Sequence, residues 1–147
     1  HRIDPVAEVV EVGERPVLLA LGDDVTFTGH VADAKPYLAA ADVAVHCSVR
    51  PEPFGLVVAE AMAQGRAVVA FDAGGPGEMI ESGVSGRLVA PGDVDALASA
   101  ITDLLARPDL RARLGEAARR RARYFSTGAM VQRMHEVYDT VLASRRA

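Results

Sequence analysis

The sequence predicts an α/β protein built around a parallel sheet, and three observations lead to this fold class. Short apolar runs alternate with segments whose apolar residues recur at helical spacing. Glycine, proline and aspartate stand between these segments. Residues 43–46 form a near-continuous apolar run of the kind that is buried on both faces of a parallel sheet. Strands that alternate with helices imply a parallel sheet with right-handed crossovers.

The elements can be placed in order from residue 25. Strands are expected at residues 25–28, 43–46, 67–71 and 87–89. Asp33 is a suitable N-cap for a helix that reaches about residue 41. A second helix is expected to open at Phe54-Gly55-Leu56 and to close at Gly65, and a short third helix covers residues 78–82.

The first 22 residues are harder to assign. Val6, Val9 and Val10 could line a short helix, which Pro16 would end. Residues 17–21 are uniformly apolar and suit either a helix or a strand, because periodicity does not separate the two.

The last third of the chain is expected to be helical. Asp93 caps one helix, Pro108 starts the next, and Ser126 or Thr127 starts the last. An apolar stripe follows the last helix and suits core or interface packing. Its members are Met130, Val131, Met134, Val137, Tyr138, Val141 and Leu142.

The candidate ligand-binding residues lie in the stretch 50–65, RPEPFGLVVAEAMAQG. Gly55 allows close approach to a ligand, and the unpaired amides of a helix start beyond it attract anions. Glu52 and Glu60 stand eight positions apart, about 10 Å along a helix axis. Apolar neighbours surround Glu60, so we expect a largely buried helix in which this carboxylate has a partner. A nucleotide sugar, with hydroxyls at both ends and charge between them, suits this spacing.

Composition narrows the class of protein. Half of the 147 residues are hydrophobic, 24% are charged and the net charge is -4, which gives no reason to expect nucleic acid or an anionic membrane as partner. The single cysteine allows no internal disulfide, and a reducing compartment fits. With no apolar run long enough to span a bilayer, we expect a cytoplasmic protein, peripheral at a membrane only through another domain.

The motif resembles a known family. The segment EPFGLVVAEAMAxG is followed by an apolar strand and then by Gly74, Gly75 and Glu78, and this series looks like the retaining glycosyltransferases of family four. The resemblance covers the chain from about Val25 onward. It implies a GT-B fold, of which residues 1–147 would be part of the Rossmann-like, nucleotide-sugar-binding domain, with a helical C-terminus.

The resemblance also implies roles. Glu52 would be the catalytic residue that holds hydroxyls of the donor sugar, and Glu60 would hold the ribose. Amides around four residues would meet the sugar and diphosphate, and a second segment would lie against the base. These residues are Phe54, Gly55, Leu56 and Val57 for the amides, and His30, Val31 and Lys35 for the base. No metal or other cofactor is expected, since amides and basic side chains neutralise the leaving diphosphate.

Measured against such an enzyme, the chain is incomplete. The acceptor-binding amino-terminal domain and the first two strands of the donor domain are missing. In the strand order 3-2-1-4-5-6, the strand at residues 25–28 would then have no neighbour, unless residues 17–21 supply one. We expect a carboxyl-terminal fragment that is inactive alone.

Several residues have a plainer interpretation. His30 suits a base contact and a solvated loop equally well. His46 is expected to be a hydrogen-bonded core residue, and Cys47 a small buried hydrophobe. Arg50 is expected at the surface, and Glu78 at a helix start, where it would satisfy the macrodipole.

Six arginines crowd one predicted helix, and they suit nucleic acid or, better in an acidic chain, a solvated face. They are Arg111, Arg113, Arg119, Arg120, Arg121 and Arg123.

Two other functions remain open beside a nucleotide-sugar transferase. One is a non-catalytic module that binds a nucleotide sugar or phosphate through the same helix start. The other is a different GT-B enzyme, such as an epimerase or a phosphorylase. The nucleotide base, the sugar and the acceptor are not specified by the sequence.

Overall fold

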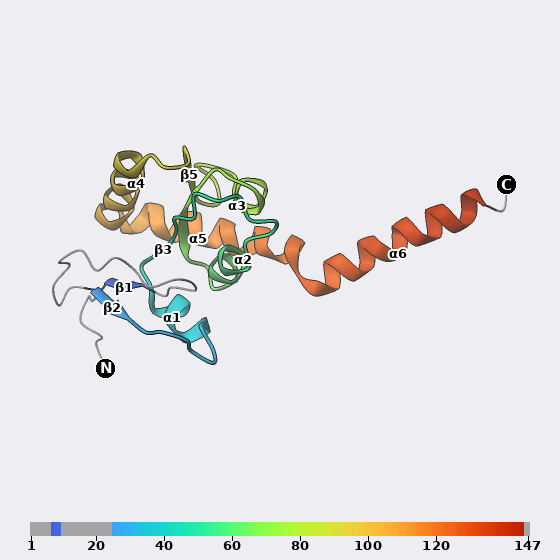
Figure 1. Ribbon diagram of the computed structural model, residues 1–147, viewed down its shortest axis with the longest axis horizontal. Coiled ribbons are helices and arrows are strands. Elements are labelled where there is room, and N and C mark those ends of the chain that lie inside the picture. Colours follow the sequence, from blue (N-terminus) through green and yellow to red (C-terminus); the bar gives the residue numbers. More distant parts are fainter. Residues whose placement is uncertain (1–6, 10–24, 146–147) are drawn as a thin grey trace.

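The computed structural model describes residues 7–9 and 25–145, and Figure 1 shows strands and helices alternating over residues 25–106, with further helices after them. The strands are β1 (Ala7–Val9), β2 (Val25–Phe27), β3 (Val43–His46), β4 (Ala67–Phe71) and β5 (Arg87–Val89). The helices are α1 (Lys35–Ala40), α2 (Leu56–Ala63), α3 (Gly75–Met79), α4 (Val94–Ala106), α5 (Pro108–Ala122) and α6 (Thr127–Ser144), with a 3₁₀ turn at Arg123–Phe125. Within these ranges, no helix is both long enough and apolar enough to cross a bilayer.

The centre of the fold is a three-stranded parallel sheet in the order β3-β4-β5. His46 at the end of β3 is level with Ala70 of β4, and Val69 of β4 is level with Arg87 of β5. Sequential strands are neighbours, and a helix connects each pair. The predicted parallel α/β architecture is therefore confirmed, and so are the expected bounds of these three strands.

Strand β4 is buried along its whole length because both faces of the sheet are covered. Val68 and Ala70 pack into a core with α2, α3 and the carboxyl-terminal half of α5. Ala67 and Val69 face the other way, into a core with α4 and the start of α5. The alternation of a strand thus divides one apolar run between two cores.

The amino-terminal strands form a separate two-stranded parallel sheet, in which Ala7 is level with Val25 and Val9 with Phe27. The expectation of a helix lined by Val6, Val9 and Val10 is wrong at Ala7–Val9, which is extended. The expectation that the strand at Val25 has no neighbour is also wrong, because β1 supplies the missing backbone partners. Residues 17–21, the other candidate neighbour, lie outside the described residues.

Two of the predicted capping residues, Asp93 and Ser126, cap their helices. Asp93 Oδ1 accepts a hydrogen bond from Ala96 N at 2.9 Å, and Ser126 Oγ accepts one from Ala129 N at 3.2 Å. The prediction of Asp33 as an N-cap is wrong by one residue, because Ala34 is the N-cap of α1, although Asp33 Oδ1 still accepts a hydrogen bond from Lys35 N at 3.0 Å. Helix α3 instead begins at Gly75, so the expected helix at 78–82 is wrong by three residues. Its first turn contains Pro76, whose fixed φ suits a helix start.

Helix α5 crosses the body and touches both cores, and several of its arginines bind backbone carbonyls at the ends of other helices. Arg111 donates to Leu104 O at 3.0 Å and Leu105 O at 2.7 Å in α4. Arg121 donates to Glu78 O at 2.9 Å and pairs with Glu81 at 2.6 Å. The predicted solvated face is therefore wrong for these two arginines, which fix neighbouring elements.

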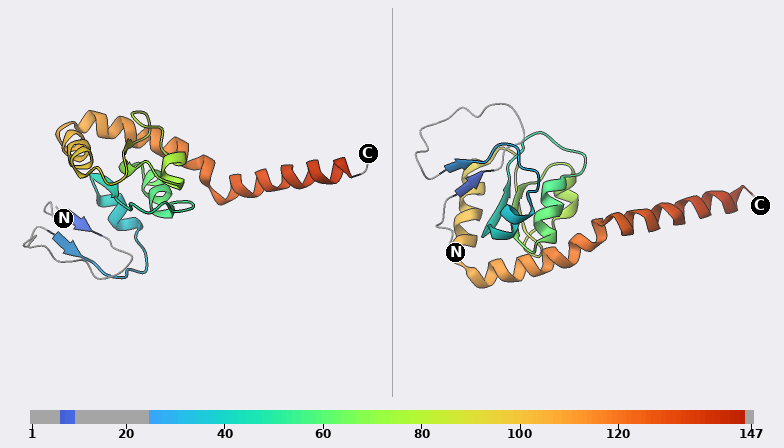
Figure 2. Two further views of the ribbon diagram at one scale, coloured as in Figure 1. Left: turned by 45° about the horizontal axis from the view of Figure 1, so that its top comes forward. Right: turned by 90° about the horizontal axis from the view of Figure 1, so that it is seen from below.

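Helix α6 extends away from the body, as Figure 1 and both views of Figure 2 show. None of its residues is buried. The seven members of its apolar stripe are all exposed, so core packing within the described chain is excluded for them.

Candidate functional site

Two loops meet at the carboxyl-terminal edge of the central sheet. Residues 47–55 follow β3 and residues 72–74 follow β4. Gly75 N donates a hydrogen bond to Glu52 O at 2.9 Å, which joins the two loops through their backbones. Because β3 and β4 are parallel neighbours, both loops leave the sheet on the same side. The structure therefore brings the Glu52 loop and the Gly74-Gly75 loop together, as their positions after strands predict.

Glycine is required where these loops touch. A Cβ on Gly75 would lie 1.9 Å from Phe54 O, and one on Gly74 would lie 2.3 Å from Glu52 O. Real Cβ atoms do not approach other atoms so closely, so a side chain at either position would force the loops apart. The paired glycines are explained by this backbone contact.

The start of α2 presents free amides beside these loops. Gly55 is its N-cap, buried and left-handed at φ 87°, and no side chain caps the helix. The amides of Val58 and Ala59 bond to Gly55 O, whereas those of Leu56 and Val57 have no hydrogen-bond partner in the described part of the chain. Leu56 and Val57 are 68% and 42% exposed. This combination of open amides and a positive helix end is suited to an anion.

Glu52, four residues before Leu56 in the sequence, is held by His46. Nε2 of His46 lies 2.5 Å from Oε1 of Glu52, and the two side chains are 11% and 37% exposed. The expectation that His46 is hydrogen-bonded is confirmed, but its partner is the candidate site carboxylate. Sequence reasoning missed this pairing, although the placement of a histidine at a strand end, six residues before Glu52, was its signal.

Glu60 is exposed, so the prediction of a largely buried helix around it is wrong. Helix α2 buries only Val58, Ala61 and Met62. These three side chains face the sheet and α5, whereas Glu60 lies on another face of the helix. Because apolar residues occur on all sides of this helix, the sequence did not indicate which of its faces packs against the core.

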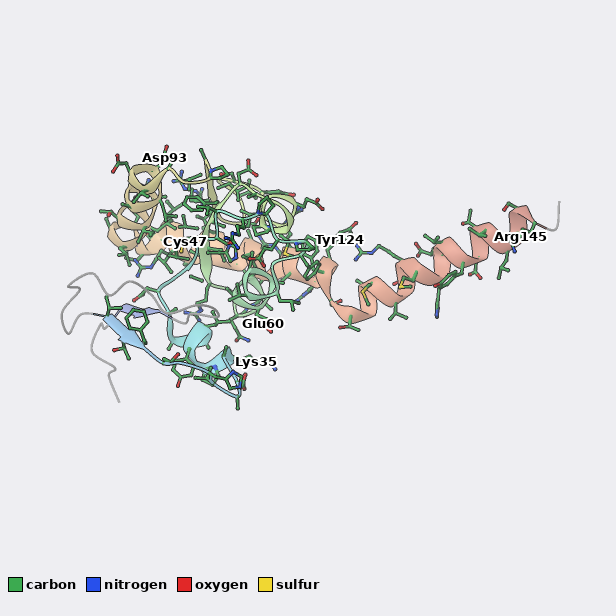
Figure 3. All side chains as sticks on the ribbon, viewed as in Figure 1. Lys35, Cys47, Glu60, Asp93, Tyr124 and Arg145 are labelled. Atoms are coloured by element: carbon green, nitrogen blue, oxygen red, sulfur yellow. The ribbon has the colours of Figure 1, made fainter. Side chains whose placement is uncertain are left out.

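The segment that was expected to lie against the base follows the smaller sheet. His30 and Lys35 are exposed and Val31 is half-buried. They lie just after β2 and at the start of α1, and α1 packs against α2. Figure 3 places Glu60 and Lys35 on these neighbouring helices, toward the lower edge of that view. Within the described ranges no hydrogen bond or ion pair joins this segment to Glu52 or Glu60.

Three other residues lie close to the site. Arg50 is exposed, as expected. Glu78 is in the first turn of α3, as expected for a carboxylate at a helix start. Cys47 is exposed, so the prediction of a buried hydrophobe is wrong. It follows the last residue of β3, where the chain leaves the sheet and its two covering layers.

Phe125 is a second neighbour that the sequence did not indicate. Its ring meets the ring of Phe54 edge-on, with centroids 6.3 Å apart, and Arg121 lies 5.7 Å from its centroid. This contact supports the Glu52 loop from the 3₁₀ turn that follows α5.

Two hollows of the molecule lie away from the site residues. One hollow of about 350 Å³ runs along α6, and another of about 220 Å³ lies beside Asp42 and Arg111. Neither is lined by Glu52, Glu60 or the start of α2. Across residues 7–9 and 25–145, no three histidine, cysteine, aspartate or glutamate side chains gather as metal ligands would.

Curated relatives resemble the chain over most of its length. It is 38% identical over 132 residues to the lipopolysaccharide core biosynthesis mannosyltransferase LpcC of Rhizobium leguminosarum bv. viciae, covering 89% of this chain and 37% of the relative. It is 35% identical over 126 residues to the phosphatidyl-myo-inositol mannosyltransferase of Mycobacterium leprae, covering 84% and 34%. The chain thus spans about a third of the length of these relatives.

Solved structures agree with this picture. HepE of Anabaena in complex with UDP has a TM-score of 0.78 and 36% identity, with 82% of this chain and 34% of that chain covered. Sucrose-phosphate synthase from Thermosynechococcus elongatus has a TM-score of 0.76 and 40% identity, with 85% and 32% covered. Both likenesses support the Rossmann-like fold as part of a GT-B glycosyltransferase.

The family model described as "Glycosyl transferases group 1" matches residues 18–121. That range contains the Glu52 loop, the open helix start and the Gly74-Gly75 loop. The chain belongs to the group 1 glycosyltransferase family.

Proposed function

We propose that this chain is part of the donor-binding half of a retaining glycosyltransferase, which transfers a sugar from a nucleoside-diphosphate sugar to an acceptor. The observation that carries the proposal is the edge where the Glu52 loop, the open start of α2 and the Gly74-Gly75 loop meet. It offers a carboxylate for hydroxyls and free amides for a diphosphate at one edge of the sheet.

Each residue of the site has a role in this proposal. Glu52 accepts hydrogen bonds from hydroxyls of the donor sugar, and Glu60 accepts them from the ribose. The amides from Phe54 to Val57 stabilise the diphosphate, whose negative charge grows as the sugar leaves. His30, Val31 and Lys35 lie against the base. The exposure of Glu60 and Lys35 leaves both free to meet a ligand.

Two structures of a related protein support a nucleotide-sugar donor. HepE of Anabaena, which is 36% identical to this chain over the matched region, has been solved in complex with UDP and with UDP-glucose. We infer a donor of the same chemical class here, without assigning its base or its sugar.

The rest of the enzyme is proposed to include an amino-terminal domain that binds the acceptor. The chain spans about a third of the length of its curated relatives, and Leu56 and Val57 at the start of α2 are exposed along the sheet edge. A second domain would close this edge and exclude water from the transfer. We propose that the 147 residues alone do not catalyse transfer.

The roles of the two carboxylates are tested in the complete product of the gene, with UDP-, GDP- and ADP-linked glucose and mannose as donors. We expect Glu60→Ala to weaken nucleoside-diphosphate binding about 10- to 100-fold, the usual range for hydrogen bonds to a charged group. Glu52→Gln should lower kcat for transfer and leave nucleoside-diphosphate affinity within about twofold. Calorimetric titration and initial-rate kinetics measure the two effects.

Glu136→Ala is the matched control, since Glu136 is an exposed carboxylate on α6. It should behave as the parent does. If Glu52→Gln and Glu60→Ala also match the parent, the assignment of these two carboxylates is wrong.

Stereochemistry and metal use are tested on the same protein. Proton NMR of the product should show the anomeric configuration of the donor, and an inverted product would refute retention. Transfer should continue in EDTA, because amides and basic side chains are proposed to neutralise the diphosphate. A loss of activity that a divalent cation restores would refute metal independence.

A further inference from the structure

We propose that His46 is a positioning residue, which fixes the Glu52 carboxylate so that its second oxygen faces the donor sugar. This inference rests on the proposed function of Glu52. The two residues come from different local structures: His46 ends β3, and Glu52 lies in the loop that follows. Their contact at 2.5 Å therefore ties the loop to the sheet through a side chain.

The direction of this hydrogen bond follows from the chemistry of the two groups. An ionised carboxylate only accepts hydrogen bonds, so Nε2 of His46 carries the proton and donates it. A bond to a charged acceptor in a partly buried place is among the stronger hydrogen bonds of a protein. It holds Glu52 in one rotamer, which a free glutamate in a loop would not keep.

Only one of the two carboxylate oxygens is used. Oε1 accepts from His46, and no described residue donates to Oε2. The Glu52 side chain remains 37% exposed, whereas that of His46 is 11% exposed. The arrangement secures the carboxylate from the buried side and leaves its other oxygen for a ligand hydroxyl.

The other ring nitrogen argues against a purely structural histidine. Nδ1 of His46 is buried and has no hydrogen-bond partner in the described part of the chain. A buried polar atom without a partner costs free energy, and an apolar side chain in this place would avoid that cost. The hydrogen bond from Nε2 to Glu52 offsets the free-energy cost of the unpaired Nδ1.

The test compares His46→Leu, which has no donor, with His46→Gln, whose amide nitrogen can donate from a similar reach. In the complete gene product, we expect His46→Leu to lower kcat for transfer about 10- to 100-fold, the range for losing a hydrogen bond to a charged group. Affinity for the bare nucleoside diphosphate should stay within about twofold of the parent, because that ligand lacks the sugar. His46→Gln should recover most of the loss.

A double variant separates positioning from stability. If His46 acts through Glu52, adding His46→Leu to Glu52→Gln should lower kcat by less than about twofold further. His135→Gln, on the exposed face of α6, is the control and should match the parent. Nucleoside-diphosphate binding also reports whether each variant is folded.

Each outcome decides between the two proposals. If Glu52→Gln impairs transfer and His46→Leu does not, the positioning role is refuted and the donor site stands. Equal losses in His46→Leu and His46→Gln, accompanied by loss of nucleotide binding, also refute it, since they indicate a folding role. If the parent binds and transfers no nucleotide sugar, the proposed function itself fails and the role of His46 fails with it.

Discussion

At the scale of single residues, two adjacent glycines decide whether the site can assemble. Gly74 has a positive φ of 58°, and a Cβ there would also clash with Glu52 O. Gly75 has an ordinary helical backbone, so only the nearness of Phe54 O demands glycine there. The two positions require the same residue for different reasons, backbone conformation at one and contact at the other.

Gly75→Ala should destabilise the protein by about 1–3 kcal/mol, the usual cost of forcing extra volume into a packed place. Gly128→Ala is the control, because a Cβ there has nothing within 4 Å and Gly128 lies in α6. In a helix this change should be neutral or stabilising by up to about 1 kcal/mol. Urea unfolding followed by circular dichroism measures both, and equal free energies of unfolding would contradict the described loop contact.

Residue-level prediction succeeded where a local rule applied. Glycine at a helix start and the loop positions after strands indicated that Gly55, Glu52 and Gly75 belong to one edge, and the backbone bond to Gly75 confirms it for the latter two. The exposure of Glu60 and the His46 contact depend on which side of α2 and β3 the core occupies. That choice is made by residues distant in sequence, so the motif alone did not contain it.

At the scale of elements, arginines of α5 donate hydrogen bonds to backbone carbonyls at the ends of other helices. Helix ends leave carbonyls without intrahelical partners, and guanidinium groups supply several donors at once. Arg111 serves the end of α4, Arg121 the end of α3, and Arg119 donates to Gln64 O after α2 at 3.1 Å. The arginine content of α5 is thus explained in part by packing, without invoking nucleic acid.

Arg121→Ala should lower the free energy of unfolding by about 1–3 kcal/mol, because carbonyls at the end of α3 lose their donor. Arg113→Ala is the control: Arg113 is exposed on the same helix and makes no hydrogen bond or ion pair with the described part of the chain. Its replacement should change the free energy by less than about 0.5 kcal/mol. Thermal and urea denaturation of both variants would contradict this role of Arg121 if their losses were equal.

Element prediction followed the strength of the local pattern. The strands at 43–46, 67–71 and 87–89 were placed correctly, because apolar runs bounded by turn residues have few alternatives. β1 and α3 were not placed correctly. β1 has three residues and depends on pairing with β2, which lies more than ten residues away in the sequence. α3 has five residues and begins at the glycine fitted against the Glu52 loop.

At the scale of the whole molecule, the compact body and α6 contribute differently to stability. The body has two cores on the faces of β4, and α5 joins them. α6 has no buried residue, and its contacts with the body include Arg133, which donates to Tyr124 O at 2.8 Å. The fold class was predictable because alternating strand and helix patterns specify a parallel sheet. The direction of α6 was not predictable, because an apolar stripe does not indicate which surface it packs against.

Removing residues 127–147 should change the free energy of unfolding of the body by less than about 1 kcal/mol, since α6 has no buried residue of its own. Removing residues 108–147 is the contrasting deletion. It takes away Leu114 and Ala118, both fully buried, and should abolish the cooperative transition. A large loss from the shorter deletion alone would show that α6 is part of the folding unit.

The backbone tie between Glu52 and Gly75 has an evolutionary consequence. The loop after β3 is anchored at one end by the sheet and at the other by this bond. Ser48, Val49 and Arg50 lie between the anchors, and the last two are exposed. Ser48 Oγ donates a hydrogen bond to Arg50 O at 3.1 Å, so the exposed side chains of Val49 and Arg50 are the ones that can be exchanged while the main chain of the loop is inherited unchanged.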